Sequence, residues 1–210
     1  MSCNWLIGGT EHLDFVEEYW RRYWPDLLFK KLVIQQNANF EFDLSCLDSL
    51  LTKGDHAFVA CDQRFGNFKR LELMHFIANK GIKLINLISP RSMVANNAKI
   101  GTNVFVADGC IIGPNCRIEY NTVILQGSSI GYKTHIRSSN WIEPGVCIGN
   151  NVNIGSNSII CTGAIVADNI SIGRNCELGW RKLYAFDIEA GSFYDSKFDN
   201  PILTYRSRIK

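Results

Sequence analysis

The chain has 210 residues, 46% of them hydrophobic and 20% charged, a composition typical of a folded protein with one large domain or two small ones. Its 22 basic and 20 acidic residues leave a formal charge of +2 without a concentrated basic stripe, so a nucleic-acid-binding surface is not expected. No apolar run approaches the length of a membrane span, and the first residues do not resemble a signal peptide. We expect a cytoplasmic protein.

The first 90 residues alternate strand patterns with helix patterns, which predicts a small, Rossmann-like parallel sheet flanked by helices. The predicted strands are 4–9, 31–36, 56–62 and 83–88, and the predicted helices are 10–24, 44–51 and 68–81.

Ligands of parallel α/β units lie beyond the carboxyl ends of the strands. The candidate substrate contacts are therefore Gly8, Gly9 and Thr10 after the first strand and Asp62 and Gln63 after the third. The stretch GGTEH is not a GxGxxG motif, and no acidic residue ends the second strand, so a dinucleotide site is not expected. A glycine pair after a strand also fits a plain turn.

From residue 94 onward an aliphatic residue recurs at every sixth position without interruption. The series is Val94, Ile100, Val106, Ile112, Ile118, Ile124, Ile130, Ile136, Ile142, Ile148, Ile154, Ile160, Val166, Ile172 and Leu178. A fixed short period marks a solenoid, and a hexapeptide period marks a parallel β-helix.

The third residue after each of the first fourteen aliphatics is nearly always Asn or Gly, which accept a left-handed backbone cheaply. These residues are Asn97, Asn103, Gly109, Asn115, Asn121, Gly127, Lys133, Ser139, Gly145, Asn151, Asn157, Gly163, Asn169 and Asn175. Each hexapeptide is therefore predicted to form a short strand followed by a corner.

The four corner glycines are spaced by 18 residues, or three hexapeptides, so each coil should be triangular and the glycines should stack at one corner. The residues before them form a predicted column of Asp108, Gln126, Pro144 and Thr162. An edge of glycines offers either a surface for a long ligand or simply the geometry of the corner, and the spacing does not choose between the two.

An α/β unit followed by an uninterrupted hexapeptide helix resembles the PglD/NeuD family of bacterial sugar acyltransferases over nearly the whole chain. Residues 77–101 are similar to the family's join between domains, and residues 187–201 are similar to its closing segment. The resemblance implies a nucleotide-sugar domain at 1–90, a left-handed β-helix at 91–183 and a C-terminal extension at 184–210. It also implies a homotrimer with acetyl-CoA in the groove between subunits.

The activity that the resemblance implies is acyl-CoA-dependent N-acylation of a nucleotide-linked amino sugar in surface glycan biosynthesis, such as that of lipopolysaccharide. Two alternatives stay open. One is an O-acetyltransferase that acts on sialic acid or another sugar hydroxyl, and the other is a non-catalytic hexapeptide-repeat binding protein.

The stretch NTVILQGSSIGYKTHI, residues 121–136, departs from the family pattern V-I-E-H-E-C-V-I-G-x-x-x-H, whose first histidine is the general base. Leu125 stands at the acid that orients the base, Gln126 at the base and His135 at the second histidine, which contacts the acyl group in relatives. A glutamine does not take up a proton near neutral pH, but its amide can orient an amine or donate to an oxyanion.

Three routes follow for the missing base: His135 takes its place, no protein group does, or activity is lost. A neutral amine tolerates the loss better than a hydroxyl does, which favours N-acylation. For CoA, the resemblance points to Pro144, Cys161, Thr162 and Gly163 on the coils after Gln126. The guanidinium of Arg174 could meet the adenosine phosphates.

The eight cysteines are scattered and form no CxxC pair, which favours buried free thiols over disulfides or zinc ligands. A hexapeptide carbonic anhydrase needs three histidine ligands for zinc, whereas His135 is the only histidine in the repeats. No metal site is expected.

Overall fold

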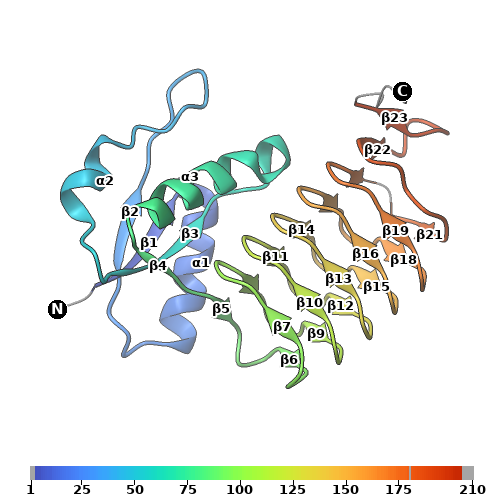
Figure 1. Ribbon diagram of the computed structural model, residues 1–210, viewed down its shortest axis with the longest axis horizontal. Helices are drawn as coiled ribbons and strands as arrows, with labels where there is room; N and C mark the ends of the chain where they lie inside the picture. The colour runs from blue at the N-terminus through green and yellow to red at the C-terminus, as the bar shows by residue number, and fades with distance from the viewer. Residues whose placement is uncertain (1–2, 180, 205–210) are drawn as a thin grey trace. The chain divides into compact units, whose positions relative to one another are not determined.

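The computed structural model describes residues 3–179 and 181–204, except for the side chains of Thr10, Asp48 and Phe65. The chain divides into two compact units, Met1–Leu87 and Ile88–Lys210. All the described helices belong to the first unit, whereas the second consists of short strands and turns (Figure 1). No helix in the described part of the chain is long and apolar enough to cross a membrane.

The first unit is a four-stranded parallel sheet in the order β2-β1-β3-β4, as predicted from the alternating pattern. Its strands are β1 Asn4–Gly8, β2 Lys30–Val33, β3 His56–Ala60 and β4 Lys83–Leu84. Its helices are α1 Thr10–Tyr23, α2 Ser45–Leu50, the 3-10 turn η1 Arg64–Asn67 and α3 Phe68–Asn79. The chain leaves β1 toward β2 and later returns on the other side of β1 as β3, so the connections diverge at the carboxyl ends of these two strands.

One predicted strand was wrong. The expected strand at 83–88 is two separate strands, β4 and β5 (Leu87–Ile88), which belong to different sheets. The apolar stretch that suggested a single strand is interrupted by Asn86, where the chain passes from one sheet to the next.

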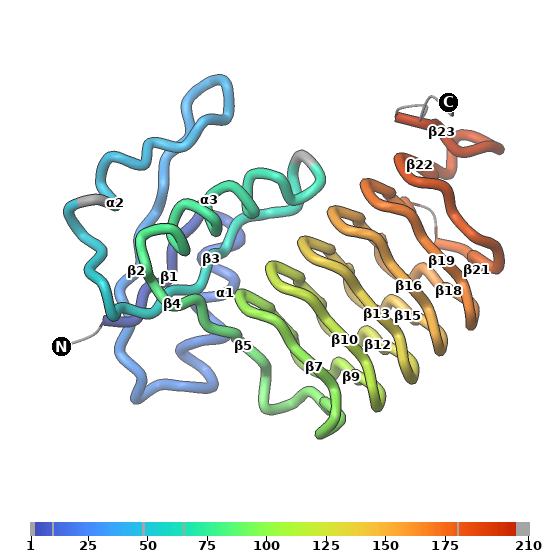
Figure 2. Tube along the Cα trace, in the orientation of Figure 1, coloured from blue at the N-terminus to red at the C-terminus, as the bar shows by residue number. Residues whose placement is uncertain are grey.

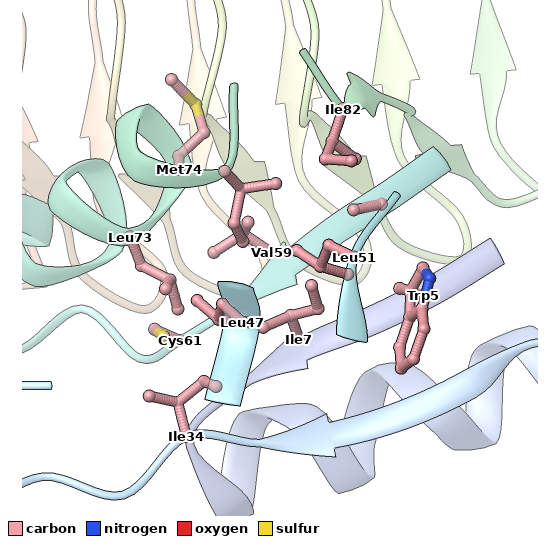
Figure 3. Close-up of a cluster of buried hydrophobic side chains, with 12 residues drawn as sticks. Trp5, Ile7, Ile34, Leu47, Leu51, Val59, Cys61, Leu73, Met74 and Ile82 are labelled. Atoms are coloured by element: carbon pink, nitrogen blue, oxygen red, sulfur yellow. The ribbon is translucent and has the colours of Figure 1, made fainter. Parts of the chain in front are cut away.

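The core of the first unit lies on both faces of the sheet, which is why β1 and β3 read as unbroken apolar runs. On one face, Ile7 and Val59 pack in a buried cluster with Leu47 of α2 and Leu73 and Met74 of α3 (Figure 3). On the other face the buried residues are Leu6 and Phe58 of the sheet and Leu13, Val16 and Trp20 of α1.

The second unit is a parallel β-solenoid whose successive coils are visible in the tube trace (Figure 2). Three sheets are named here after one strand each. The β11 sheet holds β5, β8, β11, β14, β17, β20, β22 and β23, the β12 sheet holds β6, β9, β12, β15, β18 and β21, and the β13 sheet holds β7, β10, β13, β16 and β19.

The strands that follow β5 are mostly two residues long. Their bounds are β6 Met93–Val94, β7 Lys99–Ile100, β8 Phe105–Val106, β9 Ile111–Ile112, β10 Arg117–Ile118, β11 Val123–Ile124, β12 Ser129–Ile130, β13 His135–Ile136, β14 Trp141–Ile142, β15 Cys147–Ile148, β16 Asn153–Ile154, β17 Ile159–Ile160, β18 Ile165–Val166, β19 Ser171–Ile172, β20 Glu177–Leu178, β21 Leu183–Tyr184, β22 Ser192–Tyr194 and β23 Ile202–Leu203.

The strand register confirms three hexapeptides per coil, because His135 pairs in parallel with Arg117 on one side and Asn153 on the other. The repeated aliphatic residues point inward and are buried from Val106 to Leu178. The two earlier members of the series are half-buried, because the first coil has a neighbouring coil on one side only.

The residue two places before each aliphatic also faces the interior, and several of these residues are polar. Ser128 Oγ donates to the carbonyl of Glu143 at 2.8 Å, and Thr134 Oγ1 donates to that of Gly149 at 2.8 Å. These bonds join one coil to the next and satisfy polar groups that would otherwise be costly to bury.

The predicted corners have the predicted backbone with one exception, Asn97, whose φ is not positive, so the prediction was wrong for the first corner. Every corner residue from Asn103 to Asn175 has a positive φ, including Lys133 and Ser139, and the four glycines share this conformation. Buried corner asparagines also form a ladder, in which Asn103 Nδ2 donates to Asn121 Oδ1 and Asn121 Nδ2 to Ser139 Oγ, both at 3.0 Å.

All eight cysteines are free, as predicted, but not all are buried. Cys110 and Cys116 point into the solenoid, where their thiols contact the carbonyl oxygens of Leu125 and Gly131. Cys147 is exposed, so the expectation of burial was wrong for it, because it occupies an outward position of β15. Past residue 183, β21 and β22 continue two of the sheets, and β23 pairs antiparallel with β22.

Candidate functional site

A pocket of about 430 Å³ opens at the carboxyl ends of β1 and β3. It is lined by Gly9, Glu11, His12, Gln36, Phe42, Cys61, Asp62, Gln63, Arg64 and Lys69. Three of the predicted contacts, Gly9, Asp62 and Gln63, are therefore brought together. The place is the one expected for a parallel sheet, where the loops after neighbouring strands diverge.

The other two predicted contacts in this unit have different positions. Gly8 ends β1, and a Cβ there would overlap the backbone oxygen of Ala60, so the close approach of β1 and β3 requires glycine. The side chain of Thr10 lies outside the described residues, although its backbone begins α1 after the N-cap Gly9.

Cations and an aromatic ring give the pocket its chemical character. Arg64 Nε lies 2.6 Å from Asp62 Oδ2, and Lys69 Nζ lies 5.8 Å from the centre of the Phe42 ring. Guanidinium and ammonium groups suit phosphate oxygens, and a ring offers a stacking surface for a planar group. Sequence reasoning missed Phe42, Arg64 and Lys69, because they lie in loops and at a helix start without a recognisable motif.

Two titratable groups that line the pocket, His12 and Cys61, are neutral at physiological pH. Burial, with a contribution from Arg70, lowers the pKa of His12 to about 3. Burial likewise raises the pKa of the Cys61 thiol to about 11. Neither His12 nor Cys61 is therefore poised as a base or nucleophile.

In the solenoid, most of the predicted residues gather at the glycine corner, where the chain passes from the β11 sheet to the β12 sheet. The backbone N–H of Gly145 donates to the carbonyl of Gln126 at 2.9 Å, and that of Gly163 donates to the carbonyl of Pro144 at 3.2 Å. Gln126, Pro144 and Thr162 thus stack one coil apart, and Gln126 is half-buried.

An acidic side chain organises this corner. Oε2 of Glu143 accepts hydrogen bonds from both the backbone N–H and the hydroxyl of Thr162, each at 2.8 Å. Burial, and then the charges of Glu143 and Glu177, raise the pKa of the Cys161 thiol to about 12. Cys161 therefore stays protonated and cannot act as a thiolate nucleophile. Next to it, the side chain of Arg181 covers Gly163, with Nε 2.9 Å from the position of a Cβ.

His135 and Arg174 lie elsewhere on the coil, on or next to the β13 sheet. His135 begins β13, and its side chain is 25% exposed. Arg174 is exposed in the corner that follows β19. Within one chain, His135 and Gln126 therefore occupy different parts of the coil.

The partner of His135 is Glu119, which sequence reasoning did not find. His135 Nε2 lies 2.8 Å from Glu119 Oε1, and Arg117 Nε lies 3.9 Å from the same oxygen. The two residues are 16 positions apart, two fewer than the 18 residues of one coil. Glu119 therefore lies two places beyond Arg117, the register neighbour of His135, and the pair meets diagonally on the outer face of the sheet. That offset is the signal that could have revealed the pair.

A depression of about 480 Å³ lies beside this pair on the β13 sheet. Its lining residues are Lys99, Ile100, Gly101, Arg117, Ile118, Glu119 and Tyr120. Lys99 and Arg117 are register neighbours of one another, and His135 follows them in the same outward column. Among the residues that the structure describes, no group of three His, Cys, Asp or Glu side chains could hold a metal ion.

Residues 83–176 match the family model described as GMPPB C-terminal domain. These residues cover most of the hexapeptide repeats. No curated protein sequence matches the chain at a significant level.

Solved structures match both units. PerB from Caulobacter crescentus, in complex with CoA and GDP-perosamine, is 21% identical with a TM-score of 0.78, covering 92% of this chain and 93% of that one. The acetyltransferase domain of PglB from Neisseria gonorrhoeae FA1090, in complex with acetyl coenzyme A, is 20% identical with a TM-score of 0.80, covering 96% and 100%. WeeI from Acinetobacter baumannii AYE is 16% identical with a TM-score of 0.65, covering 96% and 100%.

The chain has the fold of these proteins. The resemblance to PglD/NeuD-like sugar acyltransferases is therefore confirmed at the level of the fold.

Proposed function

We propose that the chain is an acyl-CoA-dependent N-acyltransferase that uses acetyl-CoA to acylate a nucleotide-linked amino sugar in surface glycan biosynthesis. The observation that carries this proposal is the match in fold over 92% of the chain to PerB, whose structure contains both CoA and GDP-perosamine. A related structure from the same organism is of a perosamine N-acetyltransferase with the same two ligands. The likeness includes both units, not the repeats alone.

The first unit is proposed as a Rossmann-like domain that binds the nucleotide sugar in the pocket at β1 and β3. Gly9 allows a close approach of the diphosphate, and Arg64 and Lys69 supply charge for it. Phe42 offers a stacking surface for the base, and Asp62 and Gln63 supply polar contacts. Gly8 and Thr10 complete the loop that carries Gly9.

The second unit is proposed as a left-handed β-helix that assembles as a homotrimer. Outward positions on the β12 sheet carry exposed apolar side chains, namely Met93, Ile111, Ile165 and Leu183. A stripe of this kind supports an association surface. In such a trimer, acetyl-CoA lies along the glycine corner against Pro144, Cys161, Thr162 and Gly163, and Arg174 of a neighbouring subunit meets its phosphates.

The reaction forms a bond between the amine nitrogen and the thioester carbon and breaks the bond between that carbon and sulfur. The lone pair of the amine makes the new bond, the sulfur leaves with the electron pair of the old one, and the amine proton ends on the thiolate. Gln126 is proposed to donate its amide N–H to the oxyanion or to orient the amine, because glutamine cannot take the proton. An enzyme of this pathway is expected in the cytoplasm.

Calorimetric titration with acetyl-CoA and CoA, repeated after a panel of nucleotide amino sugars, tests the proposal. Micromolar CoA binding that one sugar nucleotide strengthens, followed by an acylated amine detected by mass spectrometry, is the expected result. Acylation of a matched sugar that carries a hydroxyl in place of the amine indicates O-acylation instead. Binding without turnover points to a non-catalytic protein. If none of these ligands binds, the proposal is overturned.

A further inference from the structure

The pairing of His135 with Glu119 has the form of an oriented base. The carboxylate accepts a hydrogen bond from Nε2–H, which leaves the lone pair on Nδ1. Among the described residues, Glu119 is the sole hydrogen-bond partner of the ring. An imidazole held by a carboxylate through one nitrogen, with the other nitrogen available, is the arrangement that general-base catalysis uses on unrelated folds.

The surroundings of the pair suit a substrate that carries phosphates. Lys99 and Arg117 precede His135 in the same outward column, and Arg137 follows it by two residues, which places it on the same outer face. All three cations are exposed, and Glu119 is the acidic side chain among them. A net positive surface beside a depression of about 480 Å³ attracts a diphosphate or the phosphates of CoA.

We propose that His135 is the general base of this chain and that Glu119 is the residue that positions it. The base thereby lies on the β13 sheet rather than at the glycine corner. Because His135 and Gln126 occupy different parts of one coil, His135 of one subunit acts on an acyl group held at the glycine corner of a neighbouring subunit in the proposed homotrimer. This inference rests on the proposed function, because the proton that His135 accepts is the one released when an amine attacks a thioester.

In this step the amine nitrogen bonds to the acyl carbon, and Nδ1 of His135 takes one proton from that nitrogen. The carbonyl re-forms as the bond from carbon to sulfur breaks, and the thiolate leaves with the electron pair. The imidazolium then returns its proton to the thiolate, which gives CoA thiol and a neutral imidazole. Glu119 stabilises the transient imidazolium and keeps Nδ1 directed at the amine.

A purely structural role for the pair makes a different prediction. A surface hydrogen bond between two coils would contribute to folding stability and leave turnover unchanged in any variant that still folds. The matched control is Asp168, an exposed carboxylate that also links two coils, by accepting from the backbone N–H of Asn150 at 2.7 Å. Among the described residues the Asp168 carboxylate bonds to Asn150 and not to a histidine, so Asp168→Asn should leave kcat unchanged.

The experiment measures kcat, KM, CoA affinity and the urea midpoint for His135→Ala, Glu119→Ala, Glu119→Gln, Glu119→Asp and Asp168→Asn. His135→Ala should lower kcat by about two to four powers of ten, with CoA affinity unchanged. Glu119→Ala should lower kcat by a smaller factor without raising KM, and Glu119→Asp should restore part of the loss. The unfolding midpoint of every variant should stay close to that of the unsubstituted protein.

A second readout does not depend on turnover. Long-range ¹H–¹⁵N correlation spectra report the tautomer of each of the four histidines. His135 should be the Nε2–H tautomer in the unsubstituted protein and a mixture in Glu119→Ala. The same mixture in both proteins would show that Glu119 does not position the ring.

The outcomes separate the inference from the proposed function. Turnover that persists in His135→Ala, with CoA binding intact, overturns the inference and leaves the acyltransferase in place. If activity falls only in variants whose urea midpoint also falls, or if Asp168→Asn loses as much activity as His135→Ala, the inference is overturned in favour of a structural link. An unsubstituted protein that neither binds CoA nor turns over any amino sugar overturns both.

Discussion

The indole Nε1–H of Trp5 donates a hydrogen bond of 3.0 Å to Oδ2 of Asp55, a carboxylate that is 2% exposed. Asp55 also accepts from the backbone N–H of Cys3 at 2.8 Å and from the backbone and hydroxyl of Thr52. One buried carboxylate thus ties the start of β1 to the loop before β3. The bonds use both of its oxygens, and all the donors favour the ionised form.

This arrangement predicts acid sensitivity of the first unit. Burial alone would raise the pKa of Asp55, but the bonds from Cys3, Thr52 and Trp5 outweigh it and lower the pKa to about 2. A depressed carboxyl pKa contributes stability above the unfolded value of about 3.9, and the contribution is lost as pH falls from there toward 2. Urea midpoints measured across this window should decline on acidification.

Asp55→Asn should lower the stability of the unit at neutral pH by about 1–3 kcal/mol, because an amide nitrogen then faces hydrogen-bond donors. The decline with acid should also become shallower. Asp43→Asn is the matched control, since Asp43 is exposed and its carboxylate accepts hydrogen bonds from the backbone N–H and hydroxyl of Ser45. Equal effects of the two substitutions would contradict this assignment.

Two glycines of the solenoid should respond differently to alanine. Gly127 has φ +68° and open space around a Cβ, so Gly127→Ala should cost about 1–2 kcal/mol of backbone strain. At Gly131 a Cβ would lie 2.5 Å from backbone atoms of Gly149 in the next coil. Gly131→Ala must push two coils apart and should be the more destabilising change in thermal unfolding.

The buried ladder through Asn121 should contribute more to the free energy of unfolding than the exposed ladder through Asn151. Asn121 bridges Asn103 and Ser139 and is fully buried, whereas Asn151 makes a similar 2.9 Å bond to Asn169 at the surface. Asn121→Ala should lower the free energy of unfolding by about 2 kcal/mol or more, through unpaired neighbours and strain at positive φ.

Asn151→Ala should lower the free energy of unfolding by the backbone strain alone, because water replaces the hydrogen bond that this exposed side chain makes to Asn169. Asn121→Gly separates the two contributions in the buried ladder. Glycine removes the strain and leaves Asn103 Nδ2 without its acceptor, so this variant should recover part of the loss measured for alanine. Identical unfolding free energies for the alanine variants at 121 and 151 would argue against the ladder.

Gln126→His restores the histidine that the resemblance places at this position. Because the inferred base is His135, the substitution should not raise kcat. It should lower kcat, because it removes the glutamine amide that is proposed to donate to the oxyanion. Gln126→Ala should lower kcat in the same direction. A large gain in kcat with histidine would instead place the base at the glycine corner.

Arg64→Gln should weaken binding of the nucleotide sugar and leave CoA binding intact. A charge-assisted hydrogen bond to phosphate contributes about 1.5–3 kcal/mol, which corresponds to a loss of about 10- to 100-fold in affinity. Phe42→Ala should weaken the same ligand through lost stacking. Arg22→Gln, on an exposed part of α1, is the control, and calorimetry with each ligand separately is the measurement.

The hexapeptide period and the alternating first unit were readable from the sequence because they depend on local rules. An inward aliphatic at every sixth residue and a corner that favours Asn or Gly are each decided within one repeat. The 18 residues between corner glycines then set three strands per coil. The same reasoning failed at 83–88, where one apolar stretch serves two sheets, and at Cys147, which faces outward.

The sites needed the tertiary structure. The pocket joins Gly9, Phe42, Asp62 and Lys69 from four separate places in the chain, and no motif links them. The bond from His135 to Glu119 depends on which outward positions of neighbouring coils meet diagonally, a relation that the period alone does not reveal. The sequence by itself therefore determined the scaffold, whose contacts repeat at a constant separation. Only the folded chain decided the chemistry, because side chains distant in sequence act together when stacking and strand order bring their atoms within bonding distance.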